Sequence, residues 1–185
     1  AINSKKDSPI WHPYTVSERV INFCIFYSRF NSYLQKEEKD YLGRIIYEQS
    51  EFLFLNIEYN LGHHNHLLNN SRALLYASSL LADEPFTQKW KNTAFGLIRS
   101  EIGHQVLPDG THSEQSSTYH LLITRTFWEF RELYSLLNEP FHYEALLEKM
   151  VSYSVNLINY NNEIPLFGHL TPDFNYGDGR SYYVY

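Results

Sequence analysis

The sequence predicts an all-α protein, an (α/α) toroid or incomplete toroid in which about six to seven helices form antiparallel hairpins. Three observations favour this class. Apolar residues recur at helical spacing along most of the 185 residues, no strand-like alternation of any length occurs before residues 181–185, and the two loops richest in functional groups each open an odd-numbered helix. An up-down helical bundle would show the same periodicity, and the sequence leaves it open as an alternative.

The first four predicted helices make two hairpins. Residues 1–16 are expected to form an extended N-terminal strap, and Ser17 is the predicted N-cap of the first helix because its hydroxyl can accept a hydrogen bond from a first-turn N–H. Apolar residues at helical spacing then predict helices over about residues 17–34, 38–59, 65–81 and 86–105. Pro85 would lie near the first turn of the fourth helix.

The second half of the chain continues the helical pattern. Pro108-Asp109-Gly110 predicts a tight turn, because Pro fixes one φ angle and Gly accepts a positive one. A fifth helix is expected to begin between residues 116 and 118 and to reach Leu137, and a sixth to cover roughly residues 143–160. Residues 161–185 are predicted to be a loop that leads to further parts of the fold. We therefore expect residues 1–185 to form a single helical domain of a larger protein.

Composition and charge narrow the function classes. Fifteen Lys and Arg against twenty-one Asp and Glu give a net charge of −6, so no basic field would recruit nucleic acid. No apolar run approaches the roughly eighteen residues that a membrane span needs, and Cys24, the only cysteine, leaves no partner for an internal disulfide. Periplasmic or secreted location would require an upstream signal peptide, and a cytoplasmic location stays open.

Residues 60–120 contain most of the chemically functional side chains, including six of the nine histidines. His63-His64-Asn65-His66 could place two imidazoles on one cation, with His112, Glu114 or His120 as further ligands. The sequence has no familiar spacing such as His-Glu-x-x-His. We therefore expect neither a metal nor another cofactor, and a metal-dependent hydrolase is the weakest of three functional hypotheses.

Motifs in the same order across most of the chain resemble the N-terminal helical, alginate lyase-like domain of the heparinase II/III-like polysaccharide lyases. They are Trp11-His12-Pro13-Tyr14 with Ser17-Glu18-Arg19, Asn65-His66-Leu67-Leu68 with Ala73-Leu74, residues 105–110 (Gln-Val-Leu-Pro-Asp-Gly), Glu114-Gln115-Ser116, Tyr119-His120, Phe167-Gly168 and Gly177-Asp178-Gly179-Arg180. The resemblance implies β-elimination on a uronic-acid-containing, anionic polysaccharide. It also implies a C-terminal β-sandwich domain that this sequence does not contain.

The resemblance gives four residues catalytic roles. Asn65 would neutralise the uronate carboxylate so that the weakly acidic C5 proton can leave, aided by the positive potential of a helix N-terminus. Tyr119 would protonate the departing O4, and either Tyr119 or a histidine would remove the C5 proton. His66 would assist at the carboxylate or act as base, and His120 would position the pair.

Five further residues are predicted to contact substrate: His64, Arg72, His112, Glu114 and Arg125. Most of these site residues also have a structural interpretation, and Glu114 is expected to anchor an Arg or His rather than to act as a base. Asn65 is a good helix N-cap, Tyr119 and His120 could be core side chains with bonded polar tips, and the two arginines could pair with a neighbouring glutamate.

The substrate and the alternatives follow from charge and from the length of the chain. An acidic helical part favours a weakly sulfated or unsulfated polymer, such as a heparan-like, alginate-like or capsule polysaccharide, over highly sulfated heparin. The second functional hypothesis is a non-catalytic carbohydrate-binding or polysaccharide-biosynthesis accessory module that keeps the groove without the reaction. Sequence does not decide the oligomeric state.

Overall fold

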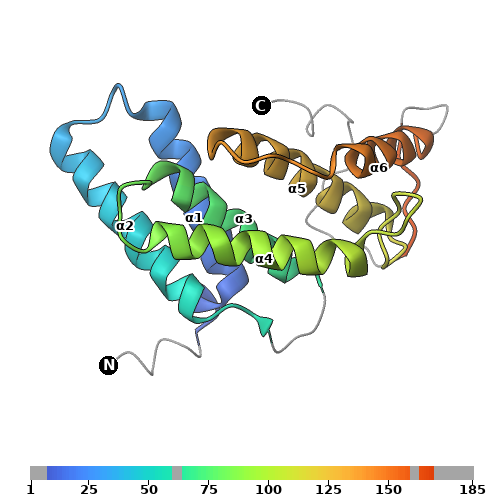
Figure 1. The fold of residues 1–185 in the computed structure, drawn as a ribbon, viewed down its shortest axis with the longest axis horizontal. Coiled ribbons are helices and arrows are strands. Elements are labelled where there is room, and N and C mark those ends of the chain that lie inside the picture. Colours follow the sequence, from blue (N-terminus) through green and yellow to red (C-terminus); the bar gives the residue numbers. More distant parts are fainter. Residues whose placement is uncertain (1–7, 60–63, 159–162, 169–185) are drawn as a thin grey trace. The chain divides into compact units, whose positions relative to one another are not determined.

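A computed structural model describes residues 8–59, 64–158 and 163–168, and the elements in these ranges are helices joined by loops (Figure 1). A short 3-10 helix, η1 (Pro9–Trp11), is followed by α1 (Pro13–Phe30), α2 (Lys36–Leu55), α3 (Asn65–Leu80), α4 (Thr87–Gln105), α5 (Ser117–Leu136) and α6 (Glu144–Asn156). Within these ranges the only extended pairing is an isolated antiparallel bridge between Val106 and His112. The predicted all-α class is confirmed. The motif at residues 177–180 and the extended stretch at 181–185 lie outside the described residues.

The chain divides into two compact units, which are described separately. The first contains Ala1–Glu101 with Leu136–Asn138, and the second contains Ile102–Ser135 with Glu139–Tyr185. Most of α4 therefore belongs to the first unit, and α5 and α6 form the second. Whether residues 1–185 behave as one domain stays a prediction. None of the described helices is both long enough and apolar enough to cross a membrane.

α1 begins four residues earlier than the sequence suggested, so the prediction that Ser17 is its N-cap was wrong. The helix starts at Pro13, a favourable first residue because that position needs no N–H donor, and His12 is the N-cap in extended conformation. Ser17 lies inside the helix, where its hydroxyl donates to the Pro13 carbonyl at 2.9 Å. The predicted strap is thus partly helical.

α2 ends earlier than predicted, and this frees the segment that precedes α3. A capping box between Gln35 and Glu38 opens the helix. At the other end Asn56 leaves helical conformation, and its side-chain amide donates to the Phe52 carbonyl at 2.7 Å. Residues 56–59 therefore lie outside the helix, and Glu58 takes a position that a longer α2 would not have given it.

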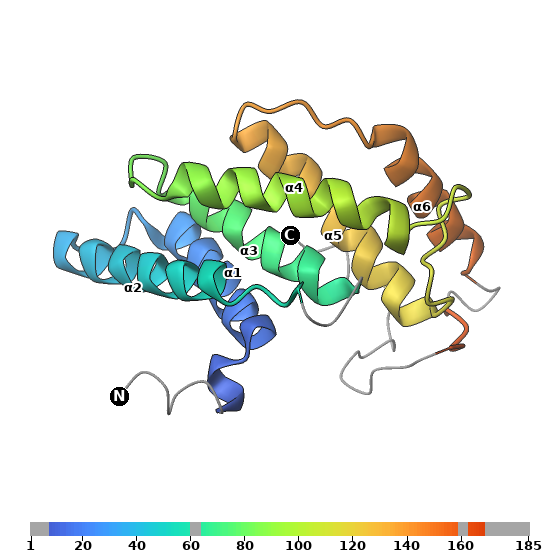
Figure 2. The ribbon, with the colours of Figure 1, turned by 60° about the horizontal axis from the view of Figure 1, so that its bottom comes forward.

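The core of the first unit is built around α3. α1 and α2 run antiparallel as a hairpin and α3 packs against both (Figure 1), and Figure 2 shows α4 alongside α3, joined to it by a short turn. Every residue from 67 to 75 is buried, including polar ones such as Asn70 and Arg72. α3 is therefore an interior helix rather than an amphipathic surface helix. Cys24 of α1 is also buried, which raises the pKa of its thiol to about 12.

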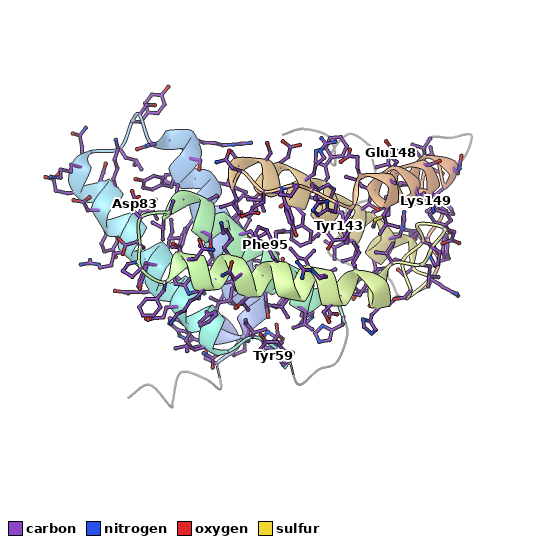
Figure 3. All side chains as sticks on the ribbon, viewed as in Figure 1. Tyr59, Asp83, Phe95, Tyr143, Glu148 and Lys149 are labelled. Atoms are coloured by element: carbon purple, nitrogen blue, oxygen red, sulfur yellow. The ribbon has the colours of Figure 1, made fainter. Side chains whose placement is uncertain are left out.

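In the second unit the turn before α5 and the loop after α6 both pack through glycines. Gly110 has a φ of 92°, and a Cβ there would lie 2.7 Å from the backbone carbon of Lys149. Lys149, labelled in Figure 3, also donates from Nζ to the Pro108 carbonyl at 2.7 Å. The predicted turn is confirmed, since the Gly110 N–H bonds the Leu107 carbonyl at 2.9 Å. Gly168 has a φ of 74° and packs on Ser116.

Candidate functional site

His64, Asn65 and His66 form the start of α3, but not in the arrangement that the sequence predicted. His64 is the N-cap, and its Nδ1 accepts a hydrogen bond from the His66 N–H at 3.1 Å. Asn65 is the first helical residue, so the alternative interpretation of Asn65 as the N-cap does not hold. Its side chain is half-buried at the positive end of the helix, where an anion is stabilised.

Glu58 is the direct partner of His66. Its carboxylate is only 8% exposed, and Oε1 lies 3.0 Å from His66 Nδ1. Asn70 of α3, fully buried, donates from Nδ2 to Glu58 Oε2 at 3.3 Å and accepts from the Glu58 N–H at 3.2 Å. The same amide donates to Ser17 Oγ at 3.0 Å. One hydrogen-bonded network therefore joins α1, residue 58 and the start of α3.

The His66 imidazole lies against rings of the N-terminal segment and against His64. The Tyr14 ring centroid lies 4.7 Å from that of His66, and the His64 ring meets it edge-on at 4.7 Å. His12 Nε2 lies 3.6 Å from Glu58 Oε1, so one carboxylate faces two imidazoles. His12 and Tyr14 belong to the Trp-His-Pro-Tyr motif, which thereby contributes to the site as well as to the start of α1.

Burial and neighbouring charges set the protonation of this cluster. Burial alone would raise the pKa of Glu58, but the hydrogen bond from His66, the charges of His66 and His12 and the hydrogen bond from Asn70 outweigh it, and the pKa is lowered. Burial, followed by the nearby charge of His66, lowers the pKa of His64. At neutral pH Glu58 is thus an anion and His64 a neutral imidazole.

Tyr119 and His112 lie together at the start of α5 in the second unit. The Tyr119 N–H donates to Ser116 Oγ at 3.4 Å, and its half-buried ring stacks on His112 with centroids 6.3 Å apart and planes 22° from parallel. His112 is 1% exposed, and its Nδ1 accepts from the Glu114 N–H at 3.4 Å. The packing holds Tyr119 in place from one side.

His120 is a core side chain. It is 2% exposed, and its Nε2–H donates to the Met150 carbonyl at 3.1 Å and to Ser154 Oγ at 3.0 Å, which ties α5 to α6. Burial lowers the pKa of His120, and it lowers that of His112 to about 4, with His120 as the second cause. Both imidazoles are neutral near pH 7.

A cavity of about 390 Å³ lies beside these two histidines in the second unit. Its lining includes Asp109, Thr111, His112, Gln115, His120 and Tyr153. Gln115 has a φ of 50°, unusual for a residue with a side chain, in the loop that leads into α5. The cavity is therefore polar, and it adjoins the helix turn that carries Tyr119.

The two arginines have carboxylate partners within the protein. Arg72, 5% exposed, pairs with Glu18 at 3.2 Å, and Arg125 pairs with Glu129 one helical turn away at 2.9 Å. These contacts match the structural interpretation weighed for both residues. Glu114 is exposed in the loop before α5.

The structure brings together Asn65 and His66 in one unit and Tyr119, His120 and His112 in the other. That Asn65 and Tyr119 share one mouth stays a prediction. Among the described residues no three His, Cys, Asp or Glu side chains gather in a way that could hold a metal ion, and His63 lies outside those residues.

Sequence reasoning missed Glu58, His12 and Tyr14 as parts of the cluster around His66. The predicted helix over residues 38–59 places Glu58 in its last turn, as one of several acids on the helix surface. The signals that could have found it are Asn56, a residue that favours helix ends, and a lone carboxylate close before a histidine-rich loop.

The helical fold is one that solved structures share. Over 82% of this chain and 24% of the other, the structure superposes on a crystal structure of heparinase III with a TM-score of 0.70 and 23% sequence identity. A likeness at this level of identity establishes the fold class, the helical N-terminal part of heparinase III.

Sequence comparison then assigns the family. The family described as Heparinase II/III N-terminus matches residues 2–175, and the chain belongs to it. The chain is 34% identical to a heparin-sulfate lyase of Bacteroides thetaiotaomicron over 46% of its own length and 12% of that protein. It is 24% identical to a heparin-sulfate lyase of Pedobacter heparinus over 90% of its length, which covers 26% of that protein. It thus spans about a quarter or less of these relatives.

Proposed function

We propose that this chain supplies the helical half of the active-site cleft of a polysaccharide lyase that cleaves heparan sulfate-type chains at uronic acid residues. The observation that carries the proposal is family membership together with similarity, along 90% of the chain, to a heparin-sulfate lyase. The ordered, hydrogen-bonded imidazole of His66 beside Asn65 at a helix N-terminus agrees with this function.

The proposed reaction is a β-elimination. A base removes the proton from C5 of the uronate, the electron pair of that C–H bond forms the C4=C5 double bond, and the C4–O4 bond breaks as O4 takes a proton. Asn65 binds the uronate carboxylate through its amide, and the N-terminus of α3 adds positive potential, so that the developing charge is stabilised.

The remaining roles fall to Tyr119, His66 and His120. Tyr119 protonates O4, and Tyr119 or His66 removes the C5 proton, depending on the configuration at C5. His120 is sealed inside the second unit, so we assign it a positioning role through α5 and α6 rather than contact with substrate. His112 acts in the same way, because its ring stacks on Tyr119.

The test uses the ultraviolet absorbance of the conjugated double bond that elimination creates. The protein, in the full length that its gene encodes, is incubated with heparan sulfate, heparin, alginate and chondroitin sulfate. We expect absorbance to rise with heparan sulfate, and we expect Tyr119→Phe and Asn65→Ala each to lower kcat/KM by about a hundredfold or more, the scale of a positioned acid–base or charge-stabilising group.

A matched control for the first substitution is Tyr33→Phe, because Tyr33 is highly exposed in the turn between α1 and α2. Normal turnover by Tyr119→Phe and Asn65→Ala would reject the proposed roles. Absorbance that stays flat with every polysaccharide, while a labelled oligosaccharide still binds, would reject the lyase in favour of the accessory binding module.

A further inference from the structure

We propose that Glu58 is a positioning residue that fixes His66 in the tautomer with its proton on Nδ1, so that Nε2 presents a lone pair. The catalytic meaning of this tautomer rests on the proposed lyase function, whereas the tautomer itself follows from the hydrogen bonds of the first unit. The network that sets it begins at a backbone carbonyl, so the direction of each hydrogen bond can be assigned in turn.

The starting point is Pro13, whose carbonyl can only accept. It accepts from the Ser17 hydroxyl at 2.9 Å, which uses the single proton of that hydroxyl. Ser17 Oγ must then be the acceptor in its 3.0 Å contact with Asn70, which identifies the nearer atom of the Asn70 amide as nitrogen. The orientation of the Asn70 amide is therefore determined by chemistry.

A second contact gives the same orientation independently. The Glu58 N–H can only donate, and it lies 3.2 Å from the other end of the Asn70 amide, which must be the oxygen. The Asn70 nitrogen then donates to Glu58 Oε2 at 3.3 Å. Asn70 is fully buried and Glu58 nearly so, and water does not compete for these groups.

The Glu58 carboxylate in turn determines which nitrogen of His66 carries the proton. An ionised carboxylate only accepts, so the 3.0 Å contact between Glu58 Oε1 and His66 Nδ1 requires the proton on Nδ1. This hydrogen bond leaves Nε2 as the ring atom of His66 that is able to accept a proton. An imidazole held by a buried carboxylate in this way is also better able to carry positive charge during proton transfer.

The Glu58→Gln substitution tests the inference sharply, because glutamine has one oxygen and one NH₂ group where the carboxylate has two acceptors. The Asn70 nitrogen can donate only to the oxygen of the new glutamine side chain, because two other contacts fix the orientation of the Asn70 amide. The NH₂ group of the substituted side chain would then face His66 Nδ1 and convert it to an acceptor. We expect the variant to move the proton of His66 to Nε2.

The first measurement is the tautomer, read from side-chain ¹⁵N NMR of the 185-residue chain at neutral pH, with the His66 signal assigned by its loss in His66→Gln. We expect Nδ1–H in the wild type and Nε2–H in Glu58→Gln. Glu48→Gln, the same change at an exposed position of α2, should leave the spectrum of His66 as in the wild type.

Two results would overturn the inference: an Nε2–H tautomer of His66 in the wild type, or a His66 tautomer that Glu58→Gln leaves unchanged in a folded protein. The wild-type spectrum decides the matter even if Glu58→Gln does not fold. If Glu58 had a purely structural role, Glu58→Gln would lower the unfolding temperature but leave the proton of His66 on the same nitrogen.

The second measurement is turnover of heparan sulfate by the full-length protein. We expect Glu58→Gln to lower kcat by about a hundredfold, near the lower end of what a positioned acid–base group contributes, with little change in KM. An altered tautomer with unchanged kcat would show that positioning of His66 by Glu58 does not contribute to turnover, and would overturn that part of the proposal. If the wild-type protein cleaves no polysaccharide, the proposed function fails while the tautomer assignment still stands or falls by the NMR spectrum.

Discussion

At the scale of single residues, the fully buried Asn70 side chain makes three hydrogen bonds within the first unit's polar network. Its amide bonds the hydroxyl of Ser17 in α1, the backbone N–H of Glu58 and the carboxylate of Glu58, and the side chain is not exposed to solvent. A buried polar group of this kind stabilises one arrangement of the chain, because any other leaves several donors and acceptors without partners.

Asn70→Ala should therefore destabilise the protein strongly. The Glu58 N–H and Glu58 Oε2 would lose their partner inside the protein, and each unsatisfied buried group costs about 1–3 kcal/mol, so we expect a loss of about 3 kcal/mol in the free energy of unfolding. Urea unfolding followed by circular dichroism measures it. Asn22→Ala on the exposed side of α1 is the control and should be neutral or slightly stabilising. Equal stabilities for the two variants would contradict the role of Asn70.

The residue types of the site could be predicted from sequence, but their partners could not. Asn65, His66 and Tyr119 were named as candidates because motifs carry residue type and order, and their roles stay predictions. Capping of α3 was considered for Asn65 because Asn is a common N-cap, whereas the structure has the rarer His64 there. Glu58 was missed because its contacts to His66 and Asn70 depend on where α2 ends.

At the scale of elements, helix existence and order followed from periodicity, while helix ends followed from local chemistry that periodicity does not contain. α1 started at Pro13 rather than Ser17, α2 stopped at Leu55 rather than Tyr59, and α6 ended at Asn156. The turn before α5 was predictable in type because Pro108 fixes a negative φ and Gly110 accepts a positive one. That Gly110 also packs on α6 was not, since this contact joins residues about forty positions apart.

Gly110→Ala tests that packing. The backbone at residue 110 has a positive φ of 92°, and the added Cβ would lie 2.7 Å from atoms of Lys149, so both backbone strain and overlap oppose the substitution. We expect a loss of about 2 kcal/mol or more in the free energy of unfolding. Gly103→Ala in α4, where nothing lies near the new Cβ, should instead stabilise by about 0.5–1 kcal/mol. Thermal unfolding of both variants gives the comparison, and a Gly110→Ala protein as stable as the wild type would contradict the packing.

At the scale of the whole molecule, the sequence predicted the fold class and the family, and both are confirmed. The order of the motifs can be read from the sequence without knowing the three-dimensional structure, so the sequence alone was enough to indicate the family. The predicted meeting of Asn65 and Tyr119 requires the placement of two compact units, and the spacing of residues along the chain carries no information about that placement.

Stability of the protein should depend on pH through His112 and His120, which are buried in the second unit. Burial lowers the pKa of His112 from 6.5 to about 4 and also lowers the pKa of His120. Between pH 6.5 and pH 4 the unfolded chain therefore binds more protons than the folded chain, so stability is lost as pH falls through this range. For His112 alone the loss approaches about 3 kcal/mol.

The pH range separates this effect from that of Glu58. A carboxylate with a lowered pKa contributes stability above its unfolded value of 4.5, and that stability disappears only at lower pH. Urea unfolding at pH 7, 6, 5 and 4.5 should show most of the loss in the wild type and a shallower dependence in His112→Gln. His142→Gln, at an exposed position of the same unit, should follow the wild type. Identical pH dependence in all three proteins would mean that His112 binds protons in the folded state, because only a folded-state pKa near 6.5 removes its share of the dependence.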